Sequence, residues 1–124
     1  MILLAVAIGG GLGAVLRIVI ASSIQPAAWT GYPWGIFIVN ITGGLAMGLI
    51  VELSALKINL SPEIRAFLTT GILGGYTTFS TFSLDSVLLI ERGQYASAAM
   101  YVIGSTLLSI LAVFAGMWAV RVLA

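Results

Sequence analysis

The chain has 124 residues, of which 60% are hydrophobic and 7% are charged, and its formal net charge is +1. This small number of polar side chains cannot coat a water-soluble globule of this size. The composition therefore excludes a soluble domain and favours a protein embedded in a lipid bilayer. Cysteine and histidine are absent, which excludes disulfides and thiolate metal sites and removes the commonest general base. We therefore expect a membrane protein that is neither an enzyme nor a partner of nucleic acid.

Uncharged segments of membrane length alternate with isolated charges along the chain. Because a spanning helix needs about 20 apolar residues, four spans fit, at roughly 2–24, 33–56, 62–92 and 94–122. The N-terminus lacks the basic region of a cleaved signal peptide, so we expect the first span to be retained. The prediction is a single all-α domain, 1–124, with four transmembrane helices and no further domain.

The links between these spans carry recognisable start and stop signals. Trp29, Tyr32 and Trp34 in and beside the first link suit the headgroup layer of a bilayer. Ser61 is placed to cap a helix that starts at the following proline. Gly93 can adopt the left-handed conformation that ends a helix, so the third link is expected to be a tight turn.

The first two spans each contain one conspicuous polar side chain. Arg17 either extends its charge to the interface as an anchor or forms an electropositive vestibule that concentrates anions. Asn40 either makes an interhelical hydrogen bond or donates N–H to a passing anion. Glycines spaced four apart, such as Gly9 and Gly13 or Gly44 and Gly48, are interpreted as packing positions.

The third span contains the strongest local signal. Two glycines and two threonines within residues 74–78 weaken helix propensity at the midpoint of the span. We therefore predict a helix broken at the bilayer midplane, which would free carbonyls for a cation and a helix N-terminus for an anion. Phe79 and Phe82 then share one face, a spacing that usually indicates packing, but here they alternate with the hydroxyls of Ser80, Thr81 and Ser83.

Hydroxyl groups recur along one face of the fourth span. Tyr101, Ser105 and Ser109 are four residues apart and therefore lie one above another. A stripe of this kind is typical of one wall of a permeation path. The alternative is that the serines bond back to carbonyls of their own helix.

The cations are almost evenly divided between the two predicted sides of the membrane. Lys57, Arg65 and Arg121 share one side with both termini, whereas Arg92 and a snorkelling Arg17 lie on the other. Since Lys and Arg near span ends set orientation, this balance permits insertion both ways round and pairing as an antiparallel dimer. The alternative is that a single charge suffices to orient the chain. A lone four-helix bundle fills its own centre, so transport favours a path along subunit interfaces.

Three motifs resemble those of the CrcB/Fluc family of fluoride channels, and the resemblance extends over the whole chain. The motif in the third span is highly specific, whereas the glycine-rich motif in the first span is not. They read Gly9-Gly10-Gly11-x-Gly13-Ala14-x-x-Arg17, Asn40-x-x-Gly43 and Gly71-x-x-Gly74-Gly75-x-Thr77-Thr78-Phe79-Ser80-Thr81-Phe82-Ser83.

The resemblance implies four-helix subunits that form an antiparallel, dual-topology homodimer with two fluoride pores. It also implies a structural sodium ion at the dimer centre, which is not transported and is held by backbone carbonyls of Gly74 and Thr77. Such a channel would be a multi-pass protein of a prokaryotic inner membrane that passively releases toxic fluoride. The implied pore residues are phenyls, hydroxyls and one amide: Asn40, Phe79, Ser80, Thr81, Phe82, Tyr101, Ser105 and Ser109.

Two other functions remain open at this point. A proton-coupled exporter of the small multidrug type would also be a dual-topology dimer, but it needs a carboxylate deep in a span. Glu52 lies near a span end and Asp85 lies beyond the hydroxyl cluster. In a non-conducting assembly subunit, every polar side chain would instead join helices.

Overall fold

The computed structural model describes residues 1–25 and 31–123, and within these ranges it contains helices and no strand. This confirms the all-α prediction, whereas the interpretation of Trp29 lies outside the described residues. In chain order the elements, of which η1 is a π-helical segment, are α1 (Ile2–Ile24), α2 (Trp34–Leu56), α3 (Pro62–Ala66), η1 (Phe67–Leu73), α4 (Gly74–Tyr76), α5 (Phe79–Glu91) and α6 (Tyr95–Leu123).

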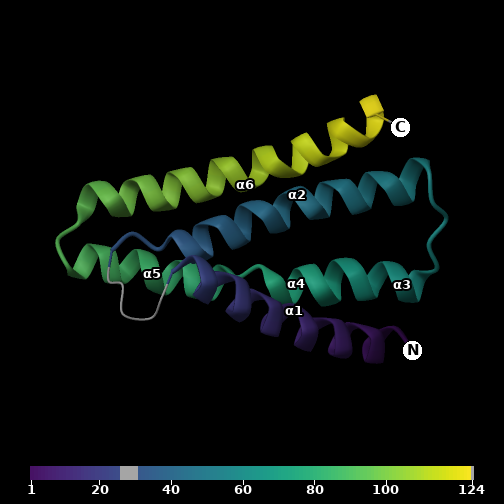
Figure 1. Cartoon of the computed structure of the whole chain (residues 1–124), viewed down its shortest axis with the longest axis horizontal. Coiled ribbons are helices and arrows are strands. Elements are labelled where there is room, and N and C mark those ends of the chain that lie inside the picture. Colours follow the sequence, from purple (N-terminus) through teal and green to yellow (C-terminus); the bar gives the residue numbers. More distant parts are fainter. Residues whose placement is uncertain (26–30, 124) are drawn as a thin grey trace.

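The described helices have the lengths of a multi-pass membrane protein. By length and composition, three of those described could cross a membrane, namely α1, α2 and α6. The segments from α3 to α5 follow one another as a fourth, interrupted rod (Figure 1). Both termini and the α2–α3 link lie at one end of the molecule, and the α5–α6 link lies at the other (Figure 1).

The predicted helix signals at the links are confirmed. Ser61 Oγ accepts a hydrogen bond from the backbone N–H of Ile64 at 3.2 Å and caps α3, with Pro62 at its first turn. Gly93 has a φ of 75° and follows α5, where an L side chain would be strained. Gln25 joins α1 to the start of α2, since its side chain donates to the Tyr32 carbonyl and accepts from the Gly35 amide.

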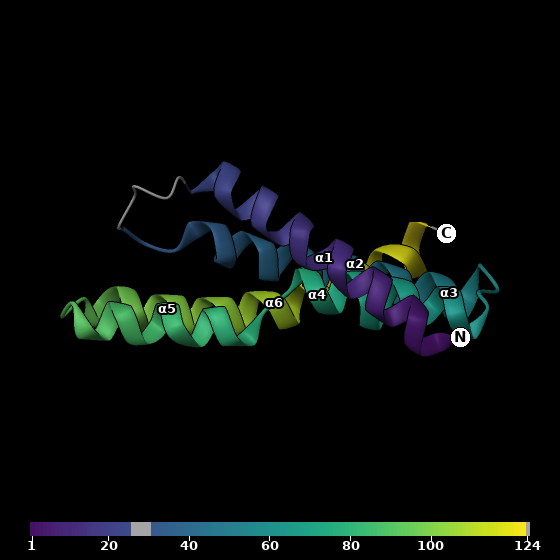
Figure 2. The same ribbon diagram turned by 90° about the horizontal axis from the view of Figure 1, so that it is seen from below.

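Glycines let α1 cross the interrupted rod at backbone distance. A Cβ at Gly9 would lie 2.7 Å from the carbonyl oxygen of Phe67, and one at Gly13 would collide with the carbonyl of Ile72. A Cβ at Gly75 would collide with the carbonyl of Gly10. The crossing places α1 against α4 near the middle of the long axis (Figure 2). The interpretation of these glycines as packing positions is confirmed.

A second glycine-lined contact joins α2 to α6, which run side by side (Figure 1). A Cβ at Gly44 would lie 2.7 Å from the carbonyl oxygen of Ser109, and one at Gly48 would collide with the carbonyl of Val113. Near the end that carries the termini, the buried carboxylate of Glu52 pairs with Arg121 across the same two helices. The backbones of α2 and α6 are therefore held close along their length.

These contacts predict opposite effects for two alanine substitutions in α1. Gly13→Ala should lower the free energy of unfolding by about 1–3 kcal/mol, because its methyl group meets backbone atoms that cannot move aside. Gly11→Ala is the matched control, since nothing lies within 4 Å of its added Cβ, and alanine has the higher helix propensity. Thermal unfolding of both variants in detergent measures the difference. Equal midpoints would contradict the packing role of Gly13.

Candidate functional site

The candidate site is built around the break between α4 and α5. Thr77 (φ −82°, ψ 158°) and Thr78 (φ −150°, ψ 125°) have extended backbones. Thr78 Oγ1 accepts a hydrogen bond from the backbone N–H of Thr81 at 3.1 Å and thereby caps α5. The structure thus contains the predicted break, and it lies near the middle of the molecule's long axis (Figures 1 and 2).

The break takes helical donors away from several carbonyls, among them those of Gly74 and Thr77. In an uninterrupted helix the N–H of Thr78 would bond to the carbonyl of Gly74, but here it donates to Asn40 Oδ1 at 2.9 Å. The N–H of Thr81 would likewise bond to the carbonyl of Thr77, but it donates to the Thr78 hydroxyl. The carbonyls of Gly74 and Thr77, the two expected to hold a cation, are therefore among those that lose their helical donors at the break.

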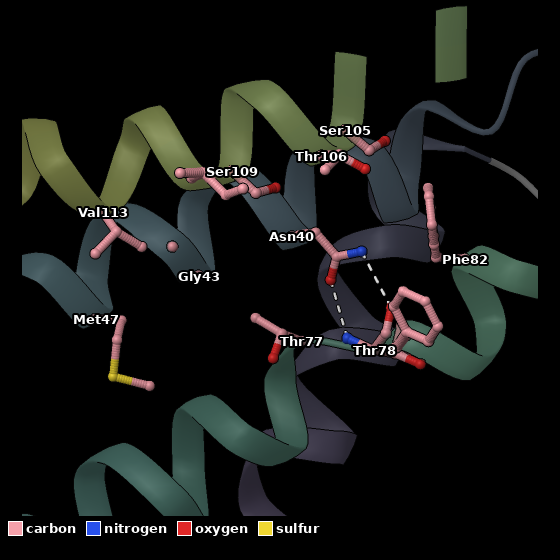
Figure 3. A pocket seen from close by; sticks show the side chains of 13 residues that line it. Asn40, Gly43, Met47, Thr77, Thr78, Phe82, Ser105, Thr106, Ser109 and Val113 are labelled. Carbon is pink, nitrogen blue, oxygen red and sulfur yellow. Dashed lines mark hydrogen bonds between the residues drawn. The ribbon is translucent and has the colours of Figure 1, made fainter. Parts of the chain in front are cut away.

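Asn40 uses both ends of its amide to hold the break. Its Oδ1 accepts from the Thr78 N–H, and its Nδ2 donates to the Thr78 carbonyl at 3.1 Å (Figure 3). This is the interhelical hydrogen bond considered from the sequence. An asparagine amide has two N–H groups, so one donor remains beside the pocket that Asn40 lines. Donation to an anion stays a prediction.

A pocket of about 400 Å³ opens between α2, the break, α5 and α6 (Figure 3). It contains five of the predicted pore residues together with Thr77 and several apolar side chains. The lining residues are Asn40, Gly43, Gly44, Met47, Thr77, Thr78, Phe79, Phe82, Ser105, Thr106, Ser109, Ile110 and Val113.

Two serine hydroxyls in this pocket are buried and unpartnered. Within the described part of the chain, the Oγ atoms of Ser105 and Ser109 have no hydrogen-bond partner. Neighbouring hydroxyls behave differently, since Thr106 donates to the Val102 carbonyl at 2.7 Å and Ser86 to the Phe82 carbonyl at 2.8 Å. The alternative that Ser105 and Ser109 bond back to their own helix is therefore wrong. Buried hydroxyls without partners are costly, so Ser105 and Ser109 are two donors that the described chain leaves unused beside the pocket.

Comparison with known proteins agrees with the sequence motifs. The family described as CrcB-like protein, Camphor Resistance (CrcB), matches residues 4–117. This chain belongs to the CrcB family. The fluoride-specific ion channel FluC of Rhodospirillum centenum is 50% identical over 119 residues, which are 96% of this chain and 94% of the relative. FluC 1 of Nitrobacter hamburgensis is 50% identical over 121 residues (98% and 96%), and FluC of Rhizobium meliloti is 47% identical over 119 residues (96% and 95%).

The two phenyl rings of this CrcB family member have different surroundings. Phe79 and Phe82 both line the pocket, with ring centroids 5.6 Å apart. Phe82 is buried and stacks 5.1 Å from Tyr101, whereas Phe79 is 79% exposed. A large apolar side chain this exposed in a single chain faces either lipid or another subunit.

The structure separates Tyr101 from the two serines of its stripe. Tyr101 is fully buried, its hydroxyl donates to Asp85 Oδ2 at 2.9 Å, and its ring does not line the pocket. Instead it packs against Tyr32 in the first link, with centroids 5.5 Å apart. Helical spacing placed the three hydroxyls on one face, but it could not predict that Asp85 binds the first of them.

Four other predicted residues lie outside the pocket. Arg17 is half-buried on α1, and Gly74 is exposed on α4. Ser80 and Thr81 lie in the first turn of α5, where the Ser80 hydroxyl is 3.3 Å from that of Thr78. The structure brings none of these side chains into the pocket formed within one chain.

Sequence reasoning missed contacts that hold the break to α2. Thr78 caps α5 and pairs with Asn40, and a threonine directly before a helix is a cap signal that the sequence offered. A Cβ at Gly43 would collide with the Thr77 side chain, so this glycine admits the break to α2. The hydroxyls of Thr42 and Tyr76 lie 2.9 Å apart, and no sequence pattern signals that pair.

The paired hydrogen bonds predict that Asn40 stabilises the fold. Asn40→Ala should lower the free energy of unfolding by about 1–3 kcal/mol, because it leaves the N–H and carbonyl of the buried Thr78 without partners. Thr106→Val is the control, since that exposed hydroxyl only bonds back to its own helix. Unfolding curves in detergent compare the two variants. A loss for Asn40→Ala no larger than for Thr106→Val would refute the structural role.

Proposed function

We propose that this protein is a fluoride-selective channel that lets fluoride leave the cytoplasm passively. The observation that carries the proposal is the pocket in which the unpartnered hydroxyls of Ser105 and Ser109 lie beside the Asn40 amide. The relatives named as fluoride-specific ion channels support it, because they match nearly the full length of the chain.

The chemistry of the pocket suits an anion that must enter and leave. Fluoride is small and strongly hydrated, so a fixed ammonium or guanidinium would hold it too tightly for conduction. None of the described residues that line the pocket is charged. Hydroxyls, one amide and the positive edges of phenyl rings can replace water in steps, and a narrow bore would exclude chloride.

A second copy of the chain would complete this path. The pocket is open on one side and Phe79 at its rim is largely exposed. The nearly even division of cations permits oppositely inserted copies. We therefore propose an antiparallel homodimer in which each fluoride path runs along the subunit interface.

A structural sodium ion that is not transported fits the break. The carbonyls of Gly74 and Thr77 have lost their helical donors to Asn40 and Thr78. Two such carbonyls from each copy would supply four oxygens without formal charge, a set that suits a monovalent cation better than calcium, which takes charged carboxylates. The role proposed for sodium is to hold the two breaks together.

The positions of Asp85 and Glu52 disfavour the proton-coupled alternative. Asp85 accepts the Tyr101 hydroxyl, and Glu52 is paired with Arg121. A proton exchanger needs a carboxylate that faces its substrate, and neither lines the pocket.

The bacterial sources of the relatives support an inner membrane as the location of this protein.

Liposomes test the proposed conduction directly. Vesicles that contain the purified protein and internal fluoride should release fluoride rapidly, whereas vesicles loaded with chloride should retain their anion. An imposed proton gradient should leave the fluoride permeability unchanged, because no proton exchange is required. Absence of fluoride release, or release that depends on a proton gradient, would refute the channel.

The phenyl rings provide the matched variants for this assay. Phe82→Ile and Phe79→Ile nearly conserve apolar volume and should cost about 1.5 kcal/mol or less of stability. They remove ring edges that attract an anion, so each should fold and yet conduct far more slowly. Wild-type flux in both variants would show that the rings only pack.

Labelling of a single introduced cysteine tests the orientation. The chain has no native cysteine, so Asn59→Cys in the exposed α2–α3 link gives an unambiguous signal. We expect an impermeant thiol reagent to label part of the population from each face of the membrane. Labelling from one face only would exclude oppositely inserted copies.

A further inference from the structure

Helix α2 is bonded to the break at two points. Asn40 pairs with the backbone of Thr78, and two residues later the Thr42 hydroxyl lies 2.9 Å from the Tyr76 hydroxyl. Thr42 Oγ1 also lies 2.8 Å from the Ile38 carbonyl, to which its single hydrogen is donated. Tyr76 is therefore the donor in the hydroxyl pair. We call these two bonded pairs the clamp.

The two halves of the clamp lie on opposite sides of α2. Residues two apart in an α-helix are separated by about 200° around its axis, so Asn40 and Thr42 point in nearly opposite directions. Between them, Gly43 leaves the space that the Tyr76 ring and the Thr77 side chain occupy. Tyr76 and Thr78 therefore straddle α2, and this arrangement resists both sliding and rotation of the break.

The clamp also determines where the Thr77 carbonyl points. The peptide bond between Thr77 and Thr78 is trans and planar, so its C=O and N–H point in opposite directions. Because the N–H donates to Asn40, the Thr77 carbonyl points to the side opposite Asn40. On the other side of this residue, the buried Tyr76 is tied to Thr42.

The short helix α4 continues directly from η1, and the last amide bonded in this direction is that of Thr77, which donates to the Leu73 carbonyl at 3.0 Å. Helix α4 contains only Gly74–Tyr76, and the amides that would bond the carbonyls of Gly74 and Thr77 donate elsewhere. Two glycines in this segment add conformational freedom. Contacts with η1 and α1 hold the body of α4, and the side chains of α2 then set the direction of the peptide groups at its end.

We propose that Thr42 and Tyr76 are positioning residues for a monovalent cation held by the carbonyls of Gly74 and Thr77. This inference rests on the sodium site of the proposed function and adds two side chains that do not touch the ion. Neither residue lines the pocket, so their effect on the cation can be separated from the anion path.

The experiment is a sodium titration of two variants that each remove one hydroxyl, Tyr76→Phe and Thr42→Val. Loss of one neutral hydrogen bond corresponds to about a fivefold change in an equilibrium constant. The sodium concentration that gives half of the thermal stabilisation in detergent should therefore rise about fivefold in each variant. The sodium concentration for half-maximal fluoride flux should shift in parallel, and flux should recover at high sodium.

Conservative and matched variants exclude a general loss of stability. Thr42→Ser keeps the hydroxyl and should restore the wild-type midpoint, and the double variant should shift no further than either single one. Tyr95→Phe removes a hydroxyl from a tyrosine that is 68% exposed. Thr69→Val removes one that only bonds back to the Arg65 carbonyl. Neither control should move the midpoint.

The outcomes separate this inference from the proposed function. A wild-type sodium response that neither Tyr76→Phe nor Thr42→Val shifts would overturn the clamp and leave the cation site standing. Equal destabilisation with and without sodium, with an unchanged midpoint, would also overturn it. A wild-type protein whose thermal stability is indifferent to sodium would overturn the cation site and the clamp together, whatever its fluoride flux.

Discussion

The organisation of this protein depends on the need to satisfy backbone hydrogen bonds inside a membrane, where water is not available to do so. A helix that breaks at Thr77 and Thr78 must find other partners for the groups it frees. The Asn40 side chain accepts a hydrogen bond from the backbone N–H of Thr78, and the Thr78 hydroxyl accepts one from the backbone N–H of Thr81. The carbonyls that remain are concentrated at one place, so the solution to a folding problem also creates a potential site for a cation.

Close backbone packing provides the second half of the site. Gly44 and Gly48 let α2 approach carbonyls of α6, and the same two helices carry Asn40, Ser105 and Ser109 into one pocket (Figure 3). A larger side chain at Gly44 would meet the carbonyl of Ser109 itself. Packing and site geometry are therefore coupled, because the residues that allow the helices to approach lie within one turn of those that line the pocket.

Charged side chains are kept out of the pocket, although they lie in the same helices. Glu52 is neutralised by Arg121 between α2 and α6, and Asp85 accepts the Tyr101 hydroxyl. The pocket is left with neutral donors and ring edges, which interact with an anion weakly enough for it to move on. This division between engaged charges and free neutral dipoles is the physical basis of the proposed anion path.

The sequence by itself determined the solvent, the long apolar helices, the packing glycines and the position of the break, because these follow from hydropathy, span length and local backbone preference. It also predicted five of the residues that line the pocket. Helical spacing could not predict three sets of hydrogen bonds. The Tyr101 hydroxyl bonds to Asp85, the Thr78 backbone bonds to both ends of the Asn40 amide, and the Tyr76 hydroxyl bonds to that of Thr42. Those bonds join residues 16 to 38 positions apart, and only the tertiary packing of α2, α5 and α6 brings such side chains within hydrogen-bonding distance.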